Sequence, residues 1–351
     1  MKLRFIHIAD VHLGMCPESK RGFGDFRKIE LQETFFRLLL EGQKQKVDFI
    51  FIAGDLFHYP PAMEELQELN GYFKKISPIQ VVLIGGNHDY IKENGGYERF
   101  PFADNVTLLK KQSVDKVYFP ETQTTVWGFS YDKQEIRERK YDKLKPEGQG
   151  YHILLAHGGD ETHIPMDYEA LKWSGFDYIA LGHIHKPQVI VQDFMNYAGS
   201  LEPLDRTEKG EHGYFLGEIL EESQRVTFVP FSKRQYKQVD IVVEEDSLFE
   251  VEEIIRKRLE KEGEQHFYEI TLLGDTKLSG KMHFDKLERD YFVLSMEDKT
   301  RKNYSIQDLY EANKENVVGY FIQQLKHSKE PFAHEALEIG IEALLETKKP
   351  F

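Results

Sequence analysis

Short apolar runs that each end in Gly, Asp, Asn or His recur over residues 1–232, and this pattern constrains the fold more than any other feature of the chain. Continuous runs of this length, separated by helical stretches, are typical of buried strands in a sheet that is covered on both faces. Residues 28–46 and 60–76 have apolar side chains at helical spacing and are expected to form covering helices. We therefore expect a layered α/β fold. The five main runs are Leu3–Ala9, Phe49–Ala53, Val81–Ile84, Ile153–Ala156 and Tyr178–Leu181.

The segments beyond the fifth run predict how this domain closes and where a second unit begins. After His185, four short strand-like segments separated by polar turns predict antiparallel strands that complete the domain. The second unit begins near residue 233, where strand-like segments surround a charge-laced amphipathic helix at residues 248–261. We predict three parts, which are a layered α/β domain over residues 1–232, a small α+β capping domain over residues 233–303 and C-terminal helices over residues 304–351.

Composition excludes several classes of protein. The net charge of −14 argues against a chain that holds nucleic acid by bulk charge, because that mode needs a large basic face. A single cysteine, Cys16, excludes a disulfide framework and any zinc module built on cysteine. No apolar run approaches the ~18–20 residues of a membrane span. The N-terminus has a short apolar stretch followed by Asp10 and His12, unlike a signal peptide, so we expect a cytoplasmic protein with no membrane contact.

Polar residues stand directly after each of the five runs. Ligands of open α/β sheets bind outside the carboxyl ends of the strands, so these residues are expected to meet at one edge. Side chains two positions apart in an extended segment point the same way, which lets a D-x-H or H-x-H segment offer both side chains to one centre. In chain order the candidates are Asp10, His12, Asp55, Asn87, His88, His157, His183 and His185.

Without His88, this set holds two carboxylates, one amide and four imidazoles. Nitrogen and oxygen ligands with no thiolate suit Mn, Fe or Zn better than Ca or Mg alone. Seven ligands are too many for one ion, whereas two ions ~3.5–4 Å apart that share a carboxylate would use them all. Asp55 is the natural bridge, because it is a lone carboxylate between the other groups. We expect two divalent ions, Mn²⁺ before Fe²⁺, Zn²⁺ or Mg²⁺, that clamp a hydroxide for in-line attack on a phosphate ester.

Each piece of the pattern is weak by itself, and only the conjunction is specific. A lone D-x-H is more often structural than functional, and a lone G-N-H-D or G-H-x-H is only suggestive. All of them in one order, each after a predicted strand, indicate a metal site far more strongly. The remaining histidines are expected at the surface or beside the ligands, with His7 behind the first ligand pair. They include His58, His152, His163, His212 and His266.

The motifs D-x-H, G-D, G-N-H-D, H and G-H-x-H resemble, in this order, those of the calcineurin-like metallophosphoesterase superfamily. The fuller strings IADVHLG, AGDLFHYPP, GGNHDY, AHGG and ALGHIHKPQ are similar to DNA double-strand-break repair nucleases of the SbcD type. The resemblance covers residues 1–232 and implies a layered β-sandwich flanked by helices. Two positions depart from the bacterial SbcD pattern, because Val11 replaces the usual Trp and His58 the usual Asp. The string GDLFH is closer to archaeal and eukaryotic relatives.

Carried over residue by residue, the resemblance implies two metal sites that share Asp55. It also implies that His88 is the catalytic histidine, which stabilises the charge of the reacting phosphate or protonates the leaving oxygen. The neutral amide of Asn87 would fill a ligand position without adding negative charge against the phosphate. One metal would be held by Asp10, His12, Asp55 and His185, and the other by Asp55, Asn87, His157 and His183.

The resemblance also implies partners. The family's partner is an SMC-like ATPase with a long coiled coil, so we expect the nuclease subunit of an SbcCD-like complex in which the ATPase supplies most of the grip on DNA. In this chain, the loop after His12 offers basic residues for DNA contact, which are Lys20, Arg21, Arg27 and Lys28. The helices after residue 306 are expected to dock the ATPase, although their apolar faces could equally pack against each other. Those faces are Val317, Phe321 and Leu325 in one helix and Leu337, Ile341 and Leu344 in the next.

The helix over residues 62–76 carries a further candidate interface. Its apolar residues are spaced 4, 3, 4 and 3 apart, as in the seam between two packed helices. The pattern by itself favours packing on the chain's own sheet, whereas the resemblance favours a homodimer, because the family dimerises through helices at this place. We adopt the homodimer as the expectation. The seam residues are Ala62, Leu66, Leu69, Phe73 and Ile76.

Other functions share the metal pattern. Protein serine/threonine phosphatases carry an Asp-Arg-Gly string after the second motif, where this chain has Leu56–Pro60, so phosphoproteins and phosphomonoesters rank lower as substrates. A phosphodiesterase for small nucleotide-like esters stays open from the sequence alone. A scaffold that has lost its metals would lack ligands, and none of the seven is missing. We therefore expect a metal-dependent nuclease that acts on DNA.

Overall fold

The computed structural model describes residues 2–244, 247–276, 278, 284–302 and 305–346. The chain forms two compact units, Met1–Gln235 and Tyr236–Phe351. None of the helices within the described ranges is both long enough and apolar enough to span a membrane. The finer division into three parts, with boundaries at residues 232 and 303, stays a prediction.

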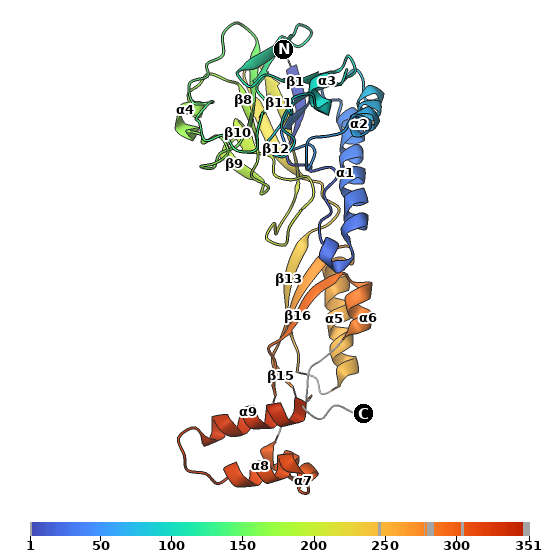
Figure 1. Cartoon of the computed structure of the whole chain (residues 1–351), viewed down its shortest axis with the longest axis vertical. Coiled ribbons are helices and arrows are strands. Elements are labelled where there is room, and N and C mark those ends of the chain that lie inside the picture. The colour runs from blue at the N-terminus through green and yellow to red at the C-terminus, as the bar shows by residue number, and fades with distance from the viewer. Residues whose placement is uncertain (1, 245–246, 277, 279–283, 303–304, 347–351) are drawn as a thin grey trace. The chain divides into compact units, whose positions relative to one another are not determined.

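Two six-stranded sheets pack face to face in the first unit, and this arrangement confirms the expected layered α/β fold (Figure 1). Side chains alternate along each strand, so one set points between the sheets and the other outward. Phe5, Phe49 and Phe51 of the first sheet share a buried cluster with Tyr178 and Ala180 of the second. In spatial order, the first sheet contains β12 (Gln224–Pro230), β11 (Gly213–Leu220), β1 (Lys2–Ile8), β2 (Phe49–Ala53), β3 (Gln80–Ile84) and β4 (Val106–Leu108). The second contains β5 (Asp115–Phe119), β6 (Thr124–Gly128), β7 (Tyr151–His157), β8 (Tyr178–Gly182), β10 (Met195–Tyr197) and β9 (Gln188–Val191).

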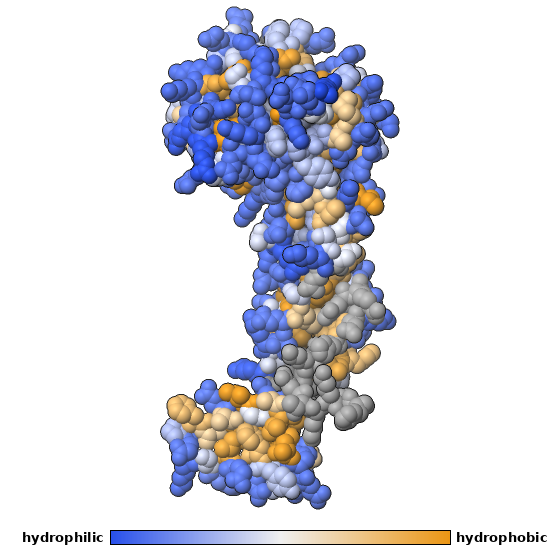
Figure 2. All heavy atoms as spheres, in the orientation of Figure 1, coloured by the Kyte–Doolittle hydropathy of each residue, from blue (hydrophilic) through white to orange (hydrophobic). Residues whose placement is uncertain are grey.

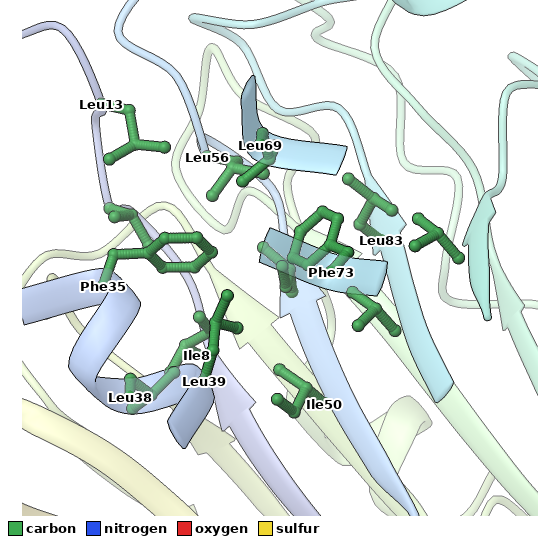
Figure 3. Close-up of a cluster of buried hydrophobic side chains, with 14 of the residues drawn as sticks. Ile8, Leu13, Phe35, Leu38, Leu39, Ile50, Leu56, Leu69, Phe73 and Leu83 are labelled. Atoms are coloured by element: carbon green, nitrogen blue, oxygen red, sulfur yellow. The ribbon is translucent and has the colours of Figure 1, made fainter. Parts of the chain in front are cut away.

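Helices α1 (Gly24–Gln45) and α2 (Met63–Lys75) cover the outer face of the first sheet. Ile8 of β1 lies in one buried cluster with Phe35 of α1 and Phe73 of α2 (Figure 3). Both helices begin and end within a few residues of the predicted positions. Their apolar stripes face the sheet, as the helical spacing of the apolar residues predicted. The short helices of this unit are η1 (Ser19–Arg21), α3 (Gly96–Arg99) and α4 (Tyr168–Lys172).

The apolar seam of α2 lies inside this cluster. Leu66 and Phe73 are fully buried, and Leu69 and Ile76 are almost so. The expectation that this seam joins two copies of the chain is therefore wrong, and the alternative, packing on the chain's own sheet, is confirmed. The spacing could not decide between them, because a helix on a sheet and a helix on a helix both need one apolar stripe.

The parallel strands at the centre of both sheets bring their carboxyl ends to one place. β1, β2 and β3 pair in parallel, and the last residue of β2, Ala53, lies opposite Ile84, the last residue of β3. In the other sheet, His157 at the end of β7 pairs with Gly182 at the end of β8. Across the sandwich, a Cβ on Gly54 would lie 2.4 Å from His157 Nδ1, so the two sheets meet closely at this edge.

Three strands over residues 106–128 were not predicted. β4 has only three residues, and β5 alternates between half-buried and exposed positions, so neither gives a continuous apolar run. The strands after residue 185 were expected to be antiparallel, and β9, β11 and β12 are. β10 instead pairs in parallel with β8, which extends the second sheet.

In the second unit, three strands form a sheet with the order β13-β14-β16. All pairings in it are parallel, whereas an α+β arrangement was expected. The reason is that a helix follows each of the first two strands and returns the chain to the same end of the sheet. The elements are β13 (Tyr236–Val242), α5 (Leu248–Glu262), β14 (Phe267–Leu273), α6 (Asp285–Asp290) and β16 (Val293–Asp298), with a short pair β15 (Asp275–Thr276) and β17 (Arg301–Lys302).

The described part of the chain after residue 305 forms three helices, α7 (Ile306–Asn313), α8 (Val317–Leu325) and α9 (Ala333–Glu346). α8 and α9 pack on each other through the buried residues Val318, Ile322, Leu337 and Ile341. The mutual packing that the sequence left open is thus present. The buried residues of α8, Val318 and Ile322, each follow an expected residue, Val317 and Phe321, by one position.

Candidate metal centre

The residues predicted for the site gather where the central strands end. Backbone hydrogen bonds join the first two loops, because the N–H of Asp10 donates to Gly54 O at 3.1 Å and the N–H of His12 donates to Asp55 O at 3.1 Å. All seven expected ligands take part in contacts with one another. They come from the loops after β1 (Asp10, His12), β2 (Asp55), β3 (Asn87) and β8 (His183, His185) and from the end of β7 (His157).

Four of these residues have a backbone conformation that non-glycine residues rarely adopt. The φ angles are 51° at Asp10, 50° at His12, 51° at Asp55 and 100° at His183. Such a conformation costs of order 1–3 kcal/mol per residue and persists only where the surroundings hold it. Asp10, His12 and Asp55 are at most 1% exposed, so tight packing provides that restraint. Strained residues cluster at functional sites, and this cluster is independent of the sequence motifs.

A glycine lets the site close around Asp55. A Cβ on Gly86 would lie 2.2 Å from the Asp55 Oδ1 atom and 2.7 Å from its backbone nitrogen. Any side chain there would push Asp55 away. The Gly of the G-N-H-D string is therefore a steric requirement of the site.

Asp10, His12 and His185 form the first ligand group, in which one ligand atom from each lies within 4.8 Å of the others. The Nε2 atoms of His12 and His185 face each other at 3.2 Å. His12 Nε2 also lies 3.7 Å from Asp55 Oδ2. Two imidazole nitrogens this close would turn lone pairs on each other unless a proton or a metal cation lies between them. The nitrogen and oxygen donors here fit a divalent cation.

Asn87, His157 and His183 form the second group. Asn87 Oδ1 lies 2.9 Å from His157 Nε2 and 3.1 Å from His183 Nδ1. His157 Nε2 also lies 3.4 Å from Asp55 Oδ2. Since His157 Nδ1–H donates to the carbonyl of Ala53 at 2.9 Å, a neutral His157 would turn the lone pair of Nε2 toward oxygen acceptors. A second proton or a metal ion removes this conflict, so this group also fits a cation.

Burial and neighbouring charges shift the pKa values of four of these groups. Burial raises the pKa of Asp10 to about 6, with the nearby charge of Asp55 adding to the effect. Burial would also raise the pKa of Asp55, but His157 outweighs it and holds that pKa below its usual range. Burial disfavours the protonated form of His157. The charge and hydrogen bond of Asp55 favour it more strongly, so the pKa of His157 rises to about 9. Burial lowers the pKa of His12. Buried carboxylates of this kind need a compensating cation.

His88 lies beside both groups, and one of its ring nitrogens lies within 4.8 Å of ligand atoms of His12 and His58. Its backbone N–H donates to Asp55 Oδ1 at 2.9 Å. Its Nδ1–H donates to the carbonyl of His58 at 3.2 Å, and the two rings stack with centroids 5.1 Å apart. His88 is only partly buried, so its ring lies at the opening of the site. The catalytic role stays a prediction.

The basic residues predicted for DNA contact differ in their surroundings. Lys20 and Lys28 are exposed. Arg27 is fully buried, where its guanidinium pairs with Glu30 and donates to the carbonyl of Pro203 at 2.8 Å. The expected DNA contact by Arg27 is therefore wrong, because the side chain does not reach the surface. The side chain of Arg21 lies outside the described residues.

Four supporting residues surround the site; His58 was expected at the surface or beside the ligands, and the other three had no predicted role. Asp89 is buried and accepts hydrogen bonds from Gly86 N–H at 2.7 Å, Phe57 N–H at 3.1 Å and the Tyr97 hydroxyl at 2.9 Å. It ties the loops after β2 and β3 together, and its place in the G-N-H-D string was the signal that could have revealed it. His58 contacts His12, with 3.2 Å between their Nδ1 atoms. The other two are Asp160 and Glu208, which contact His183 and His185.

Comparisons with known proteins point to the same chemistry. Residues 3–187 match the family described as calcineurin-like phosphoesterase. A Bacillus subtilis protein described as the uncharacterized metallophosphoesterase YhaO is 28% identical over 298 residues, which cover 78% of this chain and 72% of that protein.

Two relatives carry nuclease or repair names. The DNA double-strand break repair protein Mre11 of Methanocaldococcus jannaschii is 33% identical over 236 residues, which cover 61% of this chain and 62% of that protein. The D subunit of the nuclease SbcCD of Staphylococcus epidermidis is 25% identical over an alignment of 367 positions, which covers 92% of this chain and 93% of that protein. The chain thus spans less than two thirds of that Mre11 and most of the staphylococcal nuclease subunit.

Proposed function

The chain belongs to the calcineurin-like phosphoesterase family, and on this premise we propose that it is a DNA nuclease that hydrolyses phosphodiester bonds with two divalent metal ions. The observation that carries the proposal is the position of Asp55. Its Oδ2 lies 3.7 Å from His12 Nε2 in one ligand group and 3.4 Å from His157 Nε2 in the other. One carboxylate that reaches both groups is what a two-metal site requires.

The donor set supports two ions of the same kind. When bound, the ions activate water and neutralise the charge that builds on the phosphate during in-line displacement. Nitrogen and oxygen donors without thiolate favour Mn²⁺, and Fe²⁺, Zn²⁺ and Mg²⁺ are the alternatives. Asp10, His12 and His185 would hold one ion, Asn87, His157 and His183 the other, and Asp55 both.

We assign the proton or charge role in the reaction to His88. Because its Nδ1–H is engaged by the carbonyl of His58, Nε2 is the nitrogen left to meet a substrate. With a second proton on the ring, the imidazolium Nε2–H would donate to a phosphoryl oxygen or to the leaving oxygen, where negative charge develops. The partly exposed ring of His88 is consistent with contact to an entering phosphodiester.

Two observations favour DNA over other phosphate esters. Two relatives are named as a DNA repair protein and a nuclease subunit. In addition, Leu56 and Phe57 stand where phosphoprotein phosphatases have an Asp-Arg-Gly string, and both are buried in the core. This stretch therefore offers no guanidinium to a phosphomonoester. A small phosphodiester remains the rival substrate.

A digestion assay with Mn²⁺ tests the proposal. Linear duplex DNA, hairpin DNA and bis-p-nitrophenyl phosphate are compared at equal phosphodiester concentration, with the parent chain, Asp55→Asn and the control Asp104→Asn. Asp104 is exposed and precedes β4, away from the ligand loops. We expect DNA cleavage by the parent and the control and almost none by Asp55→Asn.

Cleavage of the small diester with no cleavage of either DNA would favour the rival substrate. Full Mn²⁺-stimulated activity of Asp55→Asn would contradict the two-metal assignment.

We further propose that the C-terminal helices dock an SMC-like ATPase. Although α8 and α9 satisfy their buried faces with each other, hydrophobic side chains remain on the surface of these helices (Figure 2). Changing Phe332 and Ile339 to Lys should abolish co-purification with a co-expressed SMC-like ATPase and leave the Mn²⁺-dependent activity of the isolated chain intact. Undiminished co-purification would place the contact elsewhere. The most exposed are Val317, Tyr320 and Ile339 on the helices and Phe332 directly before α9, which are 57–73% exposed.

A homodimer stays a proposal with a different interface. Since the predicted seam is buried, the contact would use the outward side of α1 and α2, where Ile29, Leu40 and Met63 are 57%, 61% and 43% exposed. Leu40→Glu with Met63→Glu should yield a folded monomer in analytical ultracentrifugation, because both side chains already face solvent. A parent chain that sediments as a monomer at all concentrations would remove this proposal.

A further inference from the structure

Two carboxylates outside the ligand set each contact one ligand imidazole. Glu208 Oε1 lies 2.7 Å from His185 Nδ1, and Asp160 Oδ2 lies 2.7 Å from His183 Nε2. The two imidazoles belong to different ligand groups. They are also contacted at different ring nitrogens, and this difference carries the inference.

We propose that Asp160 and Glu208 are positioning residues that fix His183 and His185 in opposite tautomers, one for each metal position. The inference rests on the proposed two-metal site and adds which nitrogen each histidine presents to it. A neutral imidazole carries one proton, and a carboxylate beside one nitrogen draws the proton there. The other nitrogen is then left with its lone pair for a metal, as in carboxylate–histidine–metal triads.

The geometry on the inner side of each ring agrees with this assignment. With Nε2 held by Asp160, His183 turns Nδ1 inward, where it lies 3.1 Å from Asn87 Oδ1. With Nδ1 held by Glu208, His185 turns Nε2 inward, where it lies 3.2 Å from His12 Nε2. Each carboxylate thus lies on the opposite side of the ring from the ligand group. Ring flips that would exchange the nitrogens would break both contacts of that ring.

Glu208 is itself held firmly, which an orienting group requires. Its Oε2 accepts hydrogen bonds from the Leu204 N–H at 2.9 Å and the Ser200 hydroxyl at 3.0 Å. The Ser200 hydroxyl also lies 2.9 Å from His212 Nδ1. The side chain of Glu208 is 12% exposed. The segment after β10 therefore contacts a ligand of the metal centre, His185, through the carboxylate of Glu208.

Asp160 is held by its own loop. Its Oδ1 accepts hydrogen bonds from the backbone N–H of Thr162 at 2.7 Å and of His163 at 2.8 Å. Its Oδ2 lies 2.9 Å from His163 Nδ1, on the same atom that contacts His183. Asp160 is 43% exposed, so its removal leaves little unsatisfied in the interior.

The test measures Mn²⁺ binding to the metal-free chain by calorimetry, for the parent and for Asp160→Asn and Glu208→Gln. Each amide can donate to or accept from the imidazole and so no longer dictates the tautomer. We expect each variant to keep one site at parental affinity and to weaken the other by roughly 10–100-fold, as is typical when a ligand loses such support. Matched controls are Asp104→Asn and Glu121→Gln, which change exposed carboxylates at the opposite edge of the sheets, where β2 and β3 begin.

A second readout separates orientation from a merely structural role. In ¹⁵N-histidine spectra of the chain loaded with Zn²⁺, His183 should carry its proton on Nε2 and His185 on Nδ1, and the proton position should become mixed in the matching variant. A parent chain that binds two Mn²⁺ ions while both variants bind them equally well would overturn this inference alone. A parent that does not bind two ions would instead contradict the proposed function. If Glu208→Gln is unstable, Asp160→Asn decides, because Asp160 lies at the surface.

Discussion

Replacing Arg27 by Met should destabilise the first unit without weakening a DNA contact. Arg27 is fully buried on α1 and was expected from the sequence to bind DNA. Its guanidinium pairs with Glu30, lies 3.7 Å from Glu202 and donates to Pro203 O at 2.8 Å. Methionine fills nearly the same volume, so the change removes charge and hydrogen bonds more than packing.

The size of the effect depends on the partners that Glu30 and Glu202 retain. Glu30 keeps Arg234, whose Nε lies 2.8 Å and 2.9 Å from its two carboxylate oxygens. Glu202 keeps hydrogen bonds from the Thr34 hydroxyl and the Lys233 N–H. Breaking a buried ion pair from one side typically costs about 3–5 kcal/mol. Because Arg234 continues to compensate Glu30, we expect the free energy of unfolding to fall by about 3 kcal/mol, at the lower end of that range.

Urea unfolding followed by tryptophan fluorescence measures this change. The chain has two tryptophans, Trp127 and Trp173, and both lie in the first unit. Lys28→Met, which changes the exposed neighbour, is the control and should shift the free energy by no more than about 0.5 kcal/mol. The reasoning is refuted if Arg27→Met is as stable as the parent and instead lowers the salt dependence of DNA binding by about one phosphate contact.

Three further predictions concern the site and its support. His88→Ala should bind two Mn²⁺ ions like the parent and lose roughly 10²–10⁴-fold in turnover; loss of metal in a calorimetric titration would make His88 a ligand. Gly86→Ala should displace Asp55, because the new Cβ would lie 2.2 Å from its Oδ1, and should weaken Mn²⁺ binding by roughly 10–100-fold; parental affinity would show that Asp55 can move freely. Burial lowers the pKa of His7 to about 3 from 6.5, so the unfolded chain takes up a proton that the folded chain refuses. Stability should therefore fall by up to roughly 1.4 kcal/mol per unit as pH drops below about 6.5, and His7→Gln should flatten this slope in urea titrations at several pH values; an equal slope in both proteins would contradict the assignment.

The ligand residues were predictable because each follows a strand whose apolar run is visible in the sequence. Parallel central strands must end at a common edge, so Asp10, Asp55 and His183 could be brought together without coordinates. The strained φ angles of these residues could not be predicted, since they depend on the packing of loops from both sheets. The supporting carboxylates Asp160 and Glu208 were missed for a similar reason. They lie in loops with no periodic pattern, and only the fold places them beside histidines that are 23 positions away.

Two predictions were wrong because a local sequence pattern is compatible with two different structures. The apolar stripe of α2 that contains Leu66 and Phe73 could pack in a dimer interface or in the core. In the structure it packs against the first sheet. The basic residues after His12 look alike in sequence, but Arg27 points inward, where Glu30, Glu202 and the carbonyl of Pro203 lie close to its guanidinium. Pro203, whose carbonyl accepts from Arg27, is 176 positions away in the chain, so no local signal reveals this partner.

Anomalous diffraction at the manganese absorption edge, from crystals of the chain soaked in Mn²⁺, tests the central claim most directly. The account predicts two peaks ~3.5–4 Å apart, as in other two-metal sites. One should be bound by Asp10, His12 and His185, the other by Asn87, His157 and His183, and Asp55 should touch both. A single peak, or a second peak that lies away from Asp55, would contradict it.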